Sequence, residues 1–256
     1  MLKKRVNTFL PRSVFLEPVI VAGAVDVNAS NAHIIVPFNL DPLTNEFTVS
    51  MGCYFLSAGD IPPTYNMQLY SQQDGTGTGR SFLTSPLVGG NISSAFGGLS
   101  YSSGFYPNLN VFQWIHLVKT GTTLLTSSIT FYRDTNQGAT FNSGSVPALS
   151  IESATGNHVI GASKGLNRNF WGYIGPVRFF SRALPAGDIA NIVAGNNFDR
   201  SDLEYEYLFT ETSGTTCYDS SGNNVNGTLV NNISFNKLSV FPEITKFNGS
   251  RAKIVY

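Results

Sequence analysis

Apolar and polar residues alternate over several short stretches of this chain. From Phe47 to Phe55 the odd positions are apolar, and the even positions are mostly small or polar as far as Tyr54. A period of two is typical of a β-strand with one buried face. Shorter stretches predict further strands, separated by turns rich in glycine, asparagine and aspartate, at residues 33–37, 67–70, 81–83 and 95–101.

One stretch predicts a strand followed at once by a helix. Residues 172–180 are rich in aromatic and β-branched residues on both parities, which indicates a mostly buried strand. Residues 185–194 then carry helix signals, with Pro185 in the first turn, Asp188 near the positive end and Gly195 as the stop. The apolar residues of this helix share one face, namely Ile189, Ile192 and Val193. A helix this short needs a sheet to pack on.

Residues 1–27 predict an N-terminal anchoring arm. The stretch begins with basic residues and shows neither helical nor clean alternating periodicity. Glu17 and Pro18 interrupt its apolar part, which makes it a poor secretory signal, so we expect the arm to stay attached. The arm either docks on another protein or forms an edge strand of the domain itself.

The composition describes one large, weakly charged domain. All-β domains of about 200–250 residues often form a single unit, and this chain has 256 residues, of which 42% are hydrophobic and 12% charged. The formal net charge is zero, so nucleic acid is not an expected partner, because binding to phosphates needs clustered Lys and Arg. No apolar run approaches the roughly 18 residues of a membrane span, so a membrane is not expected either.

Two cysteines are too few for a disulfide framework. Cys53 lies on the apolar face of the predicted strand 47–55 and is expected to be a small buried core residue. Cys217 lies next to a predicted turn. We expect two free thiols, with a bond between them as the alternative.

Four segments follow one another in an order that resembles a known family. They are EFTVS at residues 46–50, WIHLV at 114–118, ITFYRD at 129–134 and GYIGPVRFFSRALPAGDI at 172–189. Together they resemble the laminin-G-like modules of the concanavalin A-like lectin/glucanase group. The resemblance implies an all-β fold, a two-sheet antiparallel jelly-roll sandwich, with one short helix near residues 185–194.

The end of the chain resembles the part with which such modules begin. Residues 203–229 contain the acidic turn ETSGTT and the run DSSGN, and residues 247–256 resemble the next segment of the family. The resemblance implies a sandwich over residues 28–256 in which 203–256 supply the opening strands. A separate module of about fifty residues would be too small for a sandwich. Circular permutation within one chain and exchange of this segment with a neighbouring copy both remain, and we favour permutation.

No catalytic residue is predicted. The related glucanases carry two or more carboxylates in an E-x-D-x-x-E strand, and this chain has no such run. Glu204 and Glu206 share a strand face, but we expect them to be edge carboxylates. The histidines, His33, His116 and His158, stand in separate segments, so no Ser-His-Asp set can be argued. The ligand-binding residues stay unknown.

Neither a metal nor a cofactor is predicted. The sequence has no Cys/His cluster. Asp134, Asp219 and Asn223 lie at turn positions, where such residues more often bond the local backbone than calcium. The glycine run at residues 75–79 lacks the lysine and the following helix of a phosphate loop.

The tryptophans and one histidine could be mistaken for site residues. Trp114 and Trp171 lie in strand settings, where packing in the core is favoured over stacking on a sugar. His116 lies in the WIHLV segment, and we expect it to be packed or hydrogen-bonded rather than catalytic.

The sequence favours a non-enzymatic structural or adhesion protein. We expect a bacteriophage or viral virion component, such as a capsid-decorating, head-fibre or tail-associated protein, whose arm binds other virion or assembly proteins. A host-surface glycan and further copies of the chain are additional candidate partners. The alternative is a stand-alone, secreted carbohydrate-binding module, and a glucanase is a third hypothesis. The virion hypothesis rests on composition and on analogy with the family.

Overall fold

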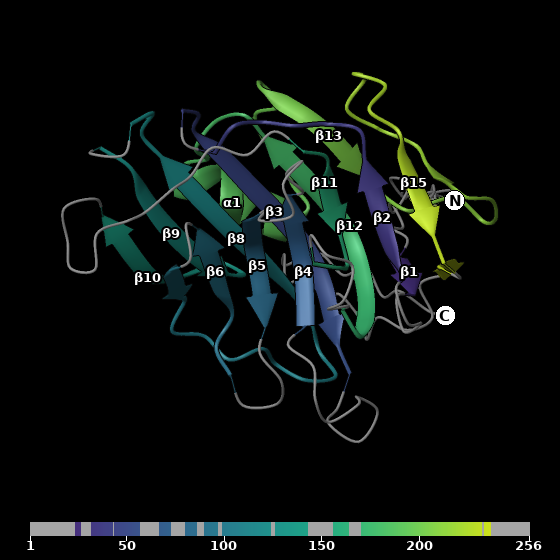
Figure 1. The fold of residues 1–256 in the computed structure, drawn as a ribbon, viewed down its shortest axis with the longest axis horizontal. Helices are drawn as coiled ribbons and strands as arrows, with labels where there is room; N and C mark the ends of the chain where they lie inside the picture. Colours follow the sequence, from purple (N-terminus) through teal and green to yellow (C-terminus); the bar gives the residue numbers. More distant parts are fainter. Residues whose placement is uncertain are drawn as a thin grey trace, which may run out of the picture.

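The described residues form two antiparallel β-sheets that pack face to face, with one helix (Figure 1). The computed structural model describes residues 24–26, 32–42, 44–56, 67–72, 80–85, 90–96, 99–123, 126–142, 156–163, 170–231 and 233–236. The all-β, two-sheet antiparallel sandwich with a short helix, which the sequence predicts, is confirmed.

Sheet A has the strand order β10-β9-β8-β3-β12-β1-β16, and β13 also pairs with β12. Its strands are β1 (Ala24–Asp26), β3 (Phe47–Phe55), β8 (Phe112–Thr120), β9 (Ser128–Arg133), β10 (Asn136–Asn142), β12 (Gly172–Phe180), β13 (Leu203–Tyr207) and β16 (Ser234–Asn236). One edge of β12 therefore pairs with β3, and the other edge is shared by β1 and β13.

Sheet B has the strand order β14-β15-β2-β11-β4-β5-β6-β7. Its strands are β2 (His33–Val36), β4 (Met67–Gln72), β5 (Arg80–Ser85), β6 (Ser93–Phe96), β7 (Leu99–Ser102), β11 (His158–Ile160), β14 (Thr216–Cys217) and β15 (Gly227–Val230). Among the described strands, β7 and β14 are the two edges of this sheet.

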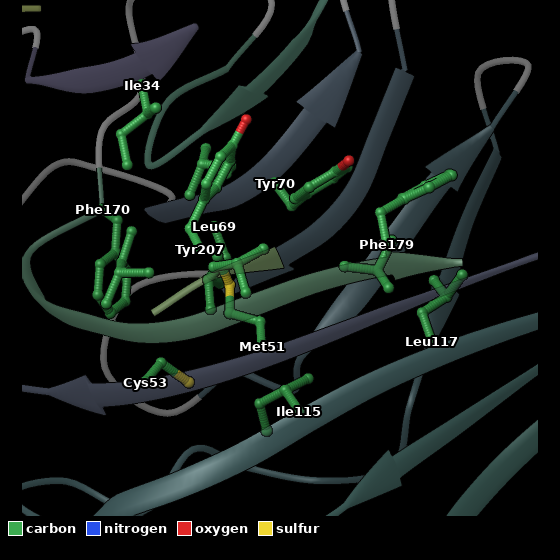
Figure 2. Close-up of a cluster of buried hydrophobic side chains, with 14 of the residues drawn as sticks. Ile34, Met51, Cys53, Leu69, Tyr70, Ile115, Leu117, Phe170, Phe179 and Tyr207 are labelled. Atoms are coloured by element: carbon green, nitrogen blue, oxygen red, sulfur yellow. The ribbon is translucent and has the colours of Figure 1, made fainter. Parts of the chain in front are cut away.

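The inner faces of the sheets enclose one hydrophobic core. Figure 2 shows side chains from both sheets meeting there, including Met51 of β3 and Leu69 of β4. The ring of Phe179 stacks nearly parallel on Tyr205 of its own sheet and on Tyr70 of the opposite sheet, with centroid distances of 5.6 and 6.3 Å. Each fully buried large apolar side chain contributes roughly 1.5–3 kcal/mol, so this aromatic stack is a main contact between the layers.

Helix α1 (Ala186–Ala194) covers part of the outer face of sheet A. Ile189 and Ile192 are buried there against a second apolar cluster that includes Trp114 and Phe180. The predicted helix is confirmed, except that Pro185 is its N-cap rather than its first residue. Gly195 ends it with φ of +67°, a left-handed conformation that glycine adopts without strain. No helix among the described residues is long and apolar enough to span a bilayer.

One strand prediction is wrong. The pattern predicts a single strand at residues 95–101, but β6 ends at Phe96 and β7 begins at Leu99, and these two residues face each other in an antiparallel pair. The chain therefore reverses between β6 and β7, which the alternation alone does not reveal, and residues 97–98 lie outside the described part.

The last described part of the predicted arm belongs to the sandwich. Residues 24–26 form β1, which pairs with β12 and with β16. These three residues therefore form a strand of the domain itself, but this strand has neighbours on both sides and is not an edge strand. Residues 1–23 lie outside the described part of the chain, so an anchoring arm stays a prediction.

The C-terminal segment completes both sheets. In one chain β13 pairs with β12, with Tyr205 opposite Phe179, and β15 pairs with β2, with Leu229 opposite Ile34. Circular permutation requires these pairs, and an exchange between copies would form the same pairs between two chains. Residues 247–256 lie outside the described part. The permuted domain over residues 28–256 therefore remains a prediction.

Circular permutation predicts a chain that stays folded as a monomer on dilution. Because β13 and β15 would complete the sheets of their own chain, a 27.7-kDa species with an unchanged β-sheet signal is expected at the lowest concentrations. Sedimentation and circular dichroism over a dilution series measure this. Loss of β-signal in step with loss of a larger species would support exchange instead, since separated copies would leave β12 and β2 unpaired.

Candidate functional site

Exposed large hydrophobic side chains gather in one loop of the described structure. Tyr106, Leu109 and Val111 are 57%, 36% and 46% exposed, and all lie in residues 103–111, between β7 and β8. Elsewhere in the described residues only Tyr218 is of this kind, and it follows β14 at the opposite edge of sheet B. Exposed apolar side chains so close together in one loop make it the candidate interaction site of the described structure.

The 103–111 loop bridges the two sheets at one edge of the sandwich. On the side of sheet B, Ile92 N donates to Phe105 O at 2.8 Å, and Ser103 N donates to Ile92 O at 2.8 Å. On the side of sheet A, Ala139 N of β10 donates to Ser103 O at 2.9 Å. The loop therefore closes the sandwich at the side where β7 and β10 are the outermost described strands of the two sheets.

Buried Gln113 of β8 fixes the tip of the loop. Its Nε2 donates to Asn108 O at 2.8 Å, and its Oε1 accepts from Asn108 N at 3.2 Å. Asn110 N donates to Phe55 O of β3 at 2.8 Å. Because the backbone is held from both sides, the exposed side chains are displayed on a preorganised support, and a ligand has less conformational entropy to remove.

Close packing against β10 also orients the loop. A Cβ atom added to Gly138 would lie 2.4 Å from Phe105 Cε2 and 2.5 Å from Ser103 O. Only glycine at this position therefore lets the loop backbone approach the strand so closely.

Arg133, the last residue of β9, lies beneath the loop. Its Nη1 donates to Tyr106 O at 2.8 Å, and its guanidinium carbon lies 5.1 Å from the centroid of the Phe105 ring. The exposed amides of Asn108 and Asn110 flank Leu109. An aromatic ring, aliphatic side chains, amides and a guanidinium are thus collected at one edge, the mixture of apolar and oriented polar groups with which proteins bind small ligands.

The amino-acid sequence alone gives only a weak signal for this loop. Its signal is the three apolar residues Tyr106, Leu109 and Val111 with asparagines between them, which is weak because their spacing has no regular period. Arg133 belongs to the ITFYRD segment, where nothing local distinguishes it from any other strand residue.

Glu206 is not an exposed edge carboxylate. Only 3% of the residue is exposed, and its two carboxylate oxygens accept from Arg178 Nε at 2.7 Å and Arg200 Nη2 at 2.8 Å. Glu204 Oε1 accepts from Ser181 Oγ at 2.5 Å. Among the described strands β13 pairs with β12, and an isolated bridge joins Tyr207 of β13 to Asp219. Glu206 balances two guanidinium groups that burial would otherwise penalise, so the prediction of an edge carboxylate is wrong for this residue.

Trp114 and His116 pack on the outer face of sheet A. Trp114 is 9% exposed, its ring stacks on that of His116 at 6.0 Å, and the Arg178 guanidinium lies 5.2 Å from the indole. The two nitrogens of His116 are buried and have no hydrogen-bond partner in the described structure. Burial, with a smaller contribution from Arg178, lowers the His116 pKa to about 3. Packed roles for Trp114 and His116 are confirmed, and Trp171 is partly buried against the main core.

His158 lies between the sheets in a polar group with two tyrosines. Its Nδ1 is 2.5 Å from Tyr70 Oη and 3.0 Å from Tyr205 Oη, and the two hydroxyls also contact each other. All three residues are fully buried, and burial lowers the His158 pKa to about 3 and raises the pKa of both tyrosines. The group joins β4 and β11 to β13 and is closed to solvent, so it is structural. His33, the remaining histidine, is buried in β2.

Asp219 organises the turn of the DSSGN run. Its carboxylate accepts from the backbone N–H groups of Glu206 at 2.9 Å, Ser221 at 2.8 Å and Val225 at 3.1 Å. Asn223 Nδ2 donates to the carbonyl oxygens at both residues 203 and 204. These contacts are the local backbone bonds expected for such residues.

Asp134 also serves a turn. It follows β9 with φ of +53°, and its Oδ1 accepts from Trp114 N at 2.9 Å. No group of three or more His, Cys, Asp or Glu side chains that could hold a metal occurs within the described residues.

Both cysteines are free and buried. Cys53 lies in the main core, as its parity in β3 predicts, and Cys217 is buried in the same cluster. Burial raises the pKa of each thiol well above its usual value, so both stay protonated and unreactive at neutral pH.

Residues 28–190 match a family model described as the concanavalin A-like lectin/glucanases superfamily. The chain belongs to this superfamily. The matched region, which is more than half of the chain, runs from before β2 into α1, so β13 to β16 lie beyond it although they pair with strands inside it. No curated protein is significantly similar to the chain in sequence.

Two solved structures illustrate the superfamily fold. A provisionally assigned carbohydrate binding protein from Bacteroides ovatus ATCC 8483 superposes with a TM-score of 0.64 at 18% identity, covering 87% of this chain and 62% of that one. The binding domain of botulinum neurotoxin serotype D has a TM-score of 0.50 at 15% identity, covering 69% of this chain and 44% of that one. At these identities the likeness shows the fold alone. The chain thus spans less than two thirds of either protein.

The two fully buried histidines predict that acid weakens the fold. Unfolded histidine titrates near 6.5, and both folded pKa values are about 3, so between these values the unfolded chain binds more protons. The free energy of unfolding should be constant above pH 6.5 and fall as the pH drops below it, by roughly 2 kcal/mol per histidine between pH 7 and pH 5. Urea unfolding at the two pH values measures this.

Matched phenylalanine variants distinguish the contributions of the two histidines to the pH dependence of stability. His116→Phe should keep the stability at pH 7, because no hydrogen bond is lost, and should remove one histidine's share of the pH dependence. His158→Phe should remove the same share but cost about 1–3 kcal/mol at pH 7, because the buried tyrosine hydroxyls lose their shared partner. An acid response that is the same in all three proteins would contradict the assignment.

Proposed function

We propose that this chain is a non-enzymatic carbohydrate-binding module that holds glycans at the 103–111 loop. The observation that carries the proposal is the exposure of Tyr106 on a backbone fixed by both sheets. Membership of a superfamily of lectins and glucanases supports it, as does the fold shared with the Bacteroides ovatus protein.

The chemistry of the loop suits a sugar. One face of a pyranose ring presents C–H groups, which pack on an aromatic ring such as that of Tyr106, while its hydroxyls bond to side-chain amides and guanidinium groups. Asn108, Asn110 and Arg133 supply such groups beside Tyr106. A binding rather than catalytic role is favoured because both oxygens of Glu206, a carboxylate considered for hydrolysis, are engaged by arginines.

We also propose, as a second role, that the module belongs to a bacteriophage or viral particle. The supporting observations are the low content of charged residues, 12%, and the basic, proline-containing N-terminal arm, which would bind other particle proteins. Glycan binding by the loop would then attach the particle to a host surface. In the alternative location the module is secreted and acts by itself.

Substitution of Tyr106 tests glycan binding. Tyr106→Ala should weaken binding to the glycans that the wild type selects on an array by at least about tenfold, which is about 1.4 kcal/mol, because the ring provides the main apolar contact. The matched control is Tyr218→Ala, which removes a similarly exposed ring at the far edge of sheet B. Calorimetric titration gives the affinities. No glycan bound by the wild type, or equal affinity for both variants, would refute the proposal.

A second pair of variants leaves Tyr106 in place. Gly138→Ala should also weaken glycan binding, since its Cβ displaces Phe105 and Ser103 from β10. Gly187→Ala is the control, because its Cβ meets no atom within 4 Å and the change suits a helix. Cleavage by chymotrypsin after Phe105 should be faster in Gly138→Ala than in the control, because the added Cβ displaces the Phe105 ring.

Removal of residues 1–23 tests the particle role. The shortened chain should keep its glycan affinity, because the described sandwich starts at Ala24, but it should no longer co-purify with particles assembled from the other components. Mass spectrometry of purified particles measures incorporation. Full incorporation of the shortened chain would contradict an anchoring arm.

A further inference from the structure

Arg133 differs from the other arginines whose side chains are described. Arg178 and Arg200 both pair with Glu206, at 2.7 and 2.8 Å, and Arg182 pairs with Asp188 at 3.1 Å and with Asp199 at 3.2 Å. Within the described residues Arg133 has no carboxylate within ion-pairing distance. Among the arginines whose side chains are described, Arg133 is therefore the one whose charge is not balanced by a described acidic side chain.

The guanidinium of Arg133 is nevertheless held in a fixed orientation. It stacks over the Phe105 ring at 5.1 Å, and Nη1 donates to Tyr106 O at 2.8 Å and reaches Asn108 Oδ1 at 3.5 Å. All of these hydrogen bonds use Nη1. The N–H groups on Nε and Nη2 form no hydrogen bond to described residues, and together they make the parallel pair of donors that matches a carboxylate.

The carboxylate of the neighbouring residue, Asp134, does not pair with the Nε and Nη2 donors of Arg133. Asp134 follows Arg133 in the chain, but its Oδ1 accepts from Trp114 N at 2.9 Å as part of the turn between β9 and β10. An oriented, unpaired donor pair therefore lies under the backbone of Tyr106, the residue whose ring is 57% exposed.

We infer that the glycan bound at the 103–111 loop carries a carboxylate, which Arg133 binds through Nε and Nη2 while the sugar ring packs on Tyr106. The inference rests on the proposed carbohydrate binding and names its ligand class: oligosaccharides that contain a sugar acid. Two parallel N–H···O bonds fix the direction of the carboxylate, so the contact selects for its planar geometry as well as for its charge.

Paired oligosaccharides test the ligand class. The probes are oligosaccharides that contain galacturonate, glucuronate or N-acetylneuraminate, each beside its carboxyl-reduced, neutral counterpart, together with a sulfated oligosaccharide. At least one acid should bind the wild type ten times more tightly than its neutral counterpart and more tightly than the sulfated sugar. Calorimetric titration at constant, low ionic strength gives the ratios.

Three variants connect this preference to Arg133. Arg133→Gln should abolish the preference, so that acid and neutral sugars bind equally, and Arg133→Lys should restore only part of it, because an ammonium keeps the charge but not the parallel donors. Arg200→Gln removes the same net charge far along the chain, from a residue paired with Glu206, and should leave the preference unchanged. Circular dichroism confirms that each variant is folded.

The outcomes separate this inference from the proposed function. Neutral sugars that bind as tightly as acids, with Tyr106→Ala still losing affinity, would overturn the inference and leave carbohydrate binding in place. If sulfated sugars bound as tightly as the sugar acids, or if Arg133→Lys kept the full acid preference of the wild type, the contact would depend on charge alone. Either result would also overturn the inference. Failure of every sugar to bind would remove the proposed function and the inference together.

Discussion

The structure depends on covering β12 on both faces and pairing it along both edges. Phe179 points into the core and stacks on rings from both sheets, and Phe180 is buried on the opposite face beneath α1. A strand buried in this way cannot leave N–H and C=O groups unpaired, because each would cost about 1–3 kcal/mol. One edge is satisfied by β3 and the other by β1 and β13, so the first described strand and a strand from near the end of the chain both pair with one central strand.

The requirement that backbone N–H and C=O groups be paired also explains the position of the 103–111 loop. A sandwich of open sheets has edges, and at this edge the loop takes hydrogen bonds from Ala139 on one side and Ile92 on the other. A segment held for this reason is rigid whether or not a ligand is present. Its apolar side chains cannot all turn inward, because Phe105 already fills the space against Gly138 and Arg133. The surface offered for binding is thus a consequence of how the edge is sealed.

Few charges are buried in the described structure, and those that are buried have partners. Glu206 is shared by two arginines, and Lys119 donates from Nζ to Asn45 O at 2.7 Å and Gly121 O at 2.5 Å, with burial lowering its pKa to about 8. His158 is neutral among hydroxyl groups. Because unpaired charge inside a protein is expensive, the pairing of the other arginines makes the environment of Arg133 distinctive.

The sequence by itself determined the fold class and its central elements. The period of two in β3 places Cys53 in the core, and the proline, aspartate and glycine around α1 define its ends to within one residue. The packed roles of Trp114 and His116 also follow from strand position, because a large ring on a mostly apolar strand is usually covered. These features depend on neighbours within a few residues, which the sequence displays directly.

Only the tertiary structure brought the candidate site together. Arg133 contacts the Tyr106 backbone across 27 residues of sequence, and Gly138 sets how closely the loop approaches β10. The reversal between β6 and β7 and the pairing of Glu206 with Arg178 are likewise decided by cross-strand register. Such contacts depend on which strands become neighbours in the sheets. That choice is made by the burial of the whole core, so no local pattern of residues records it.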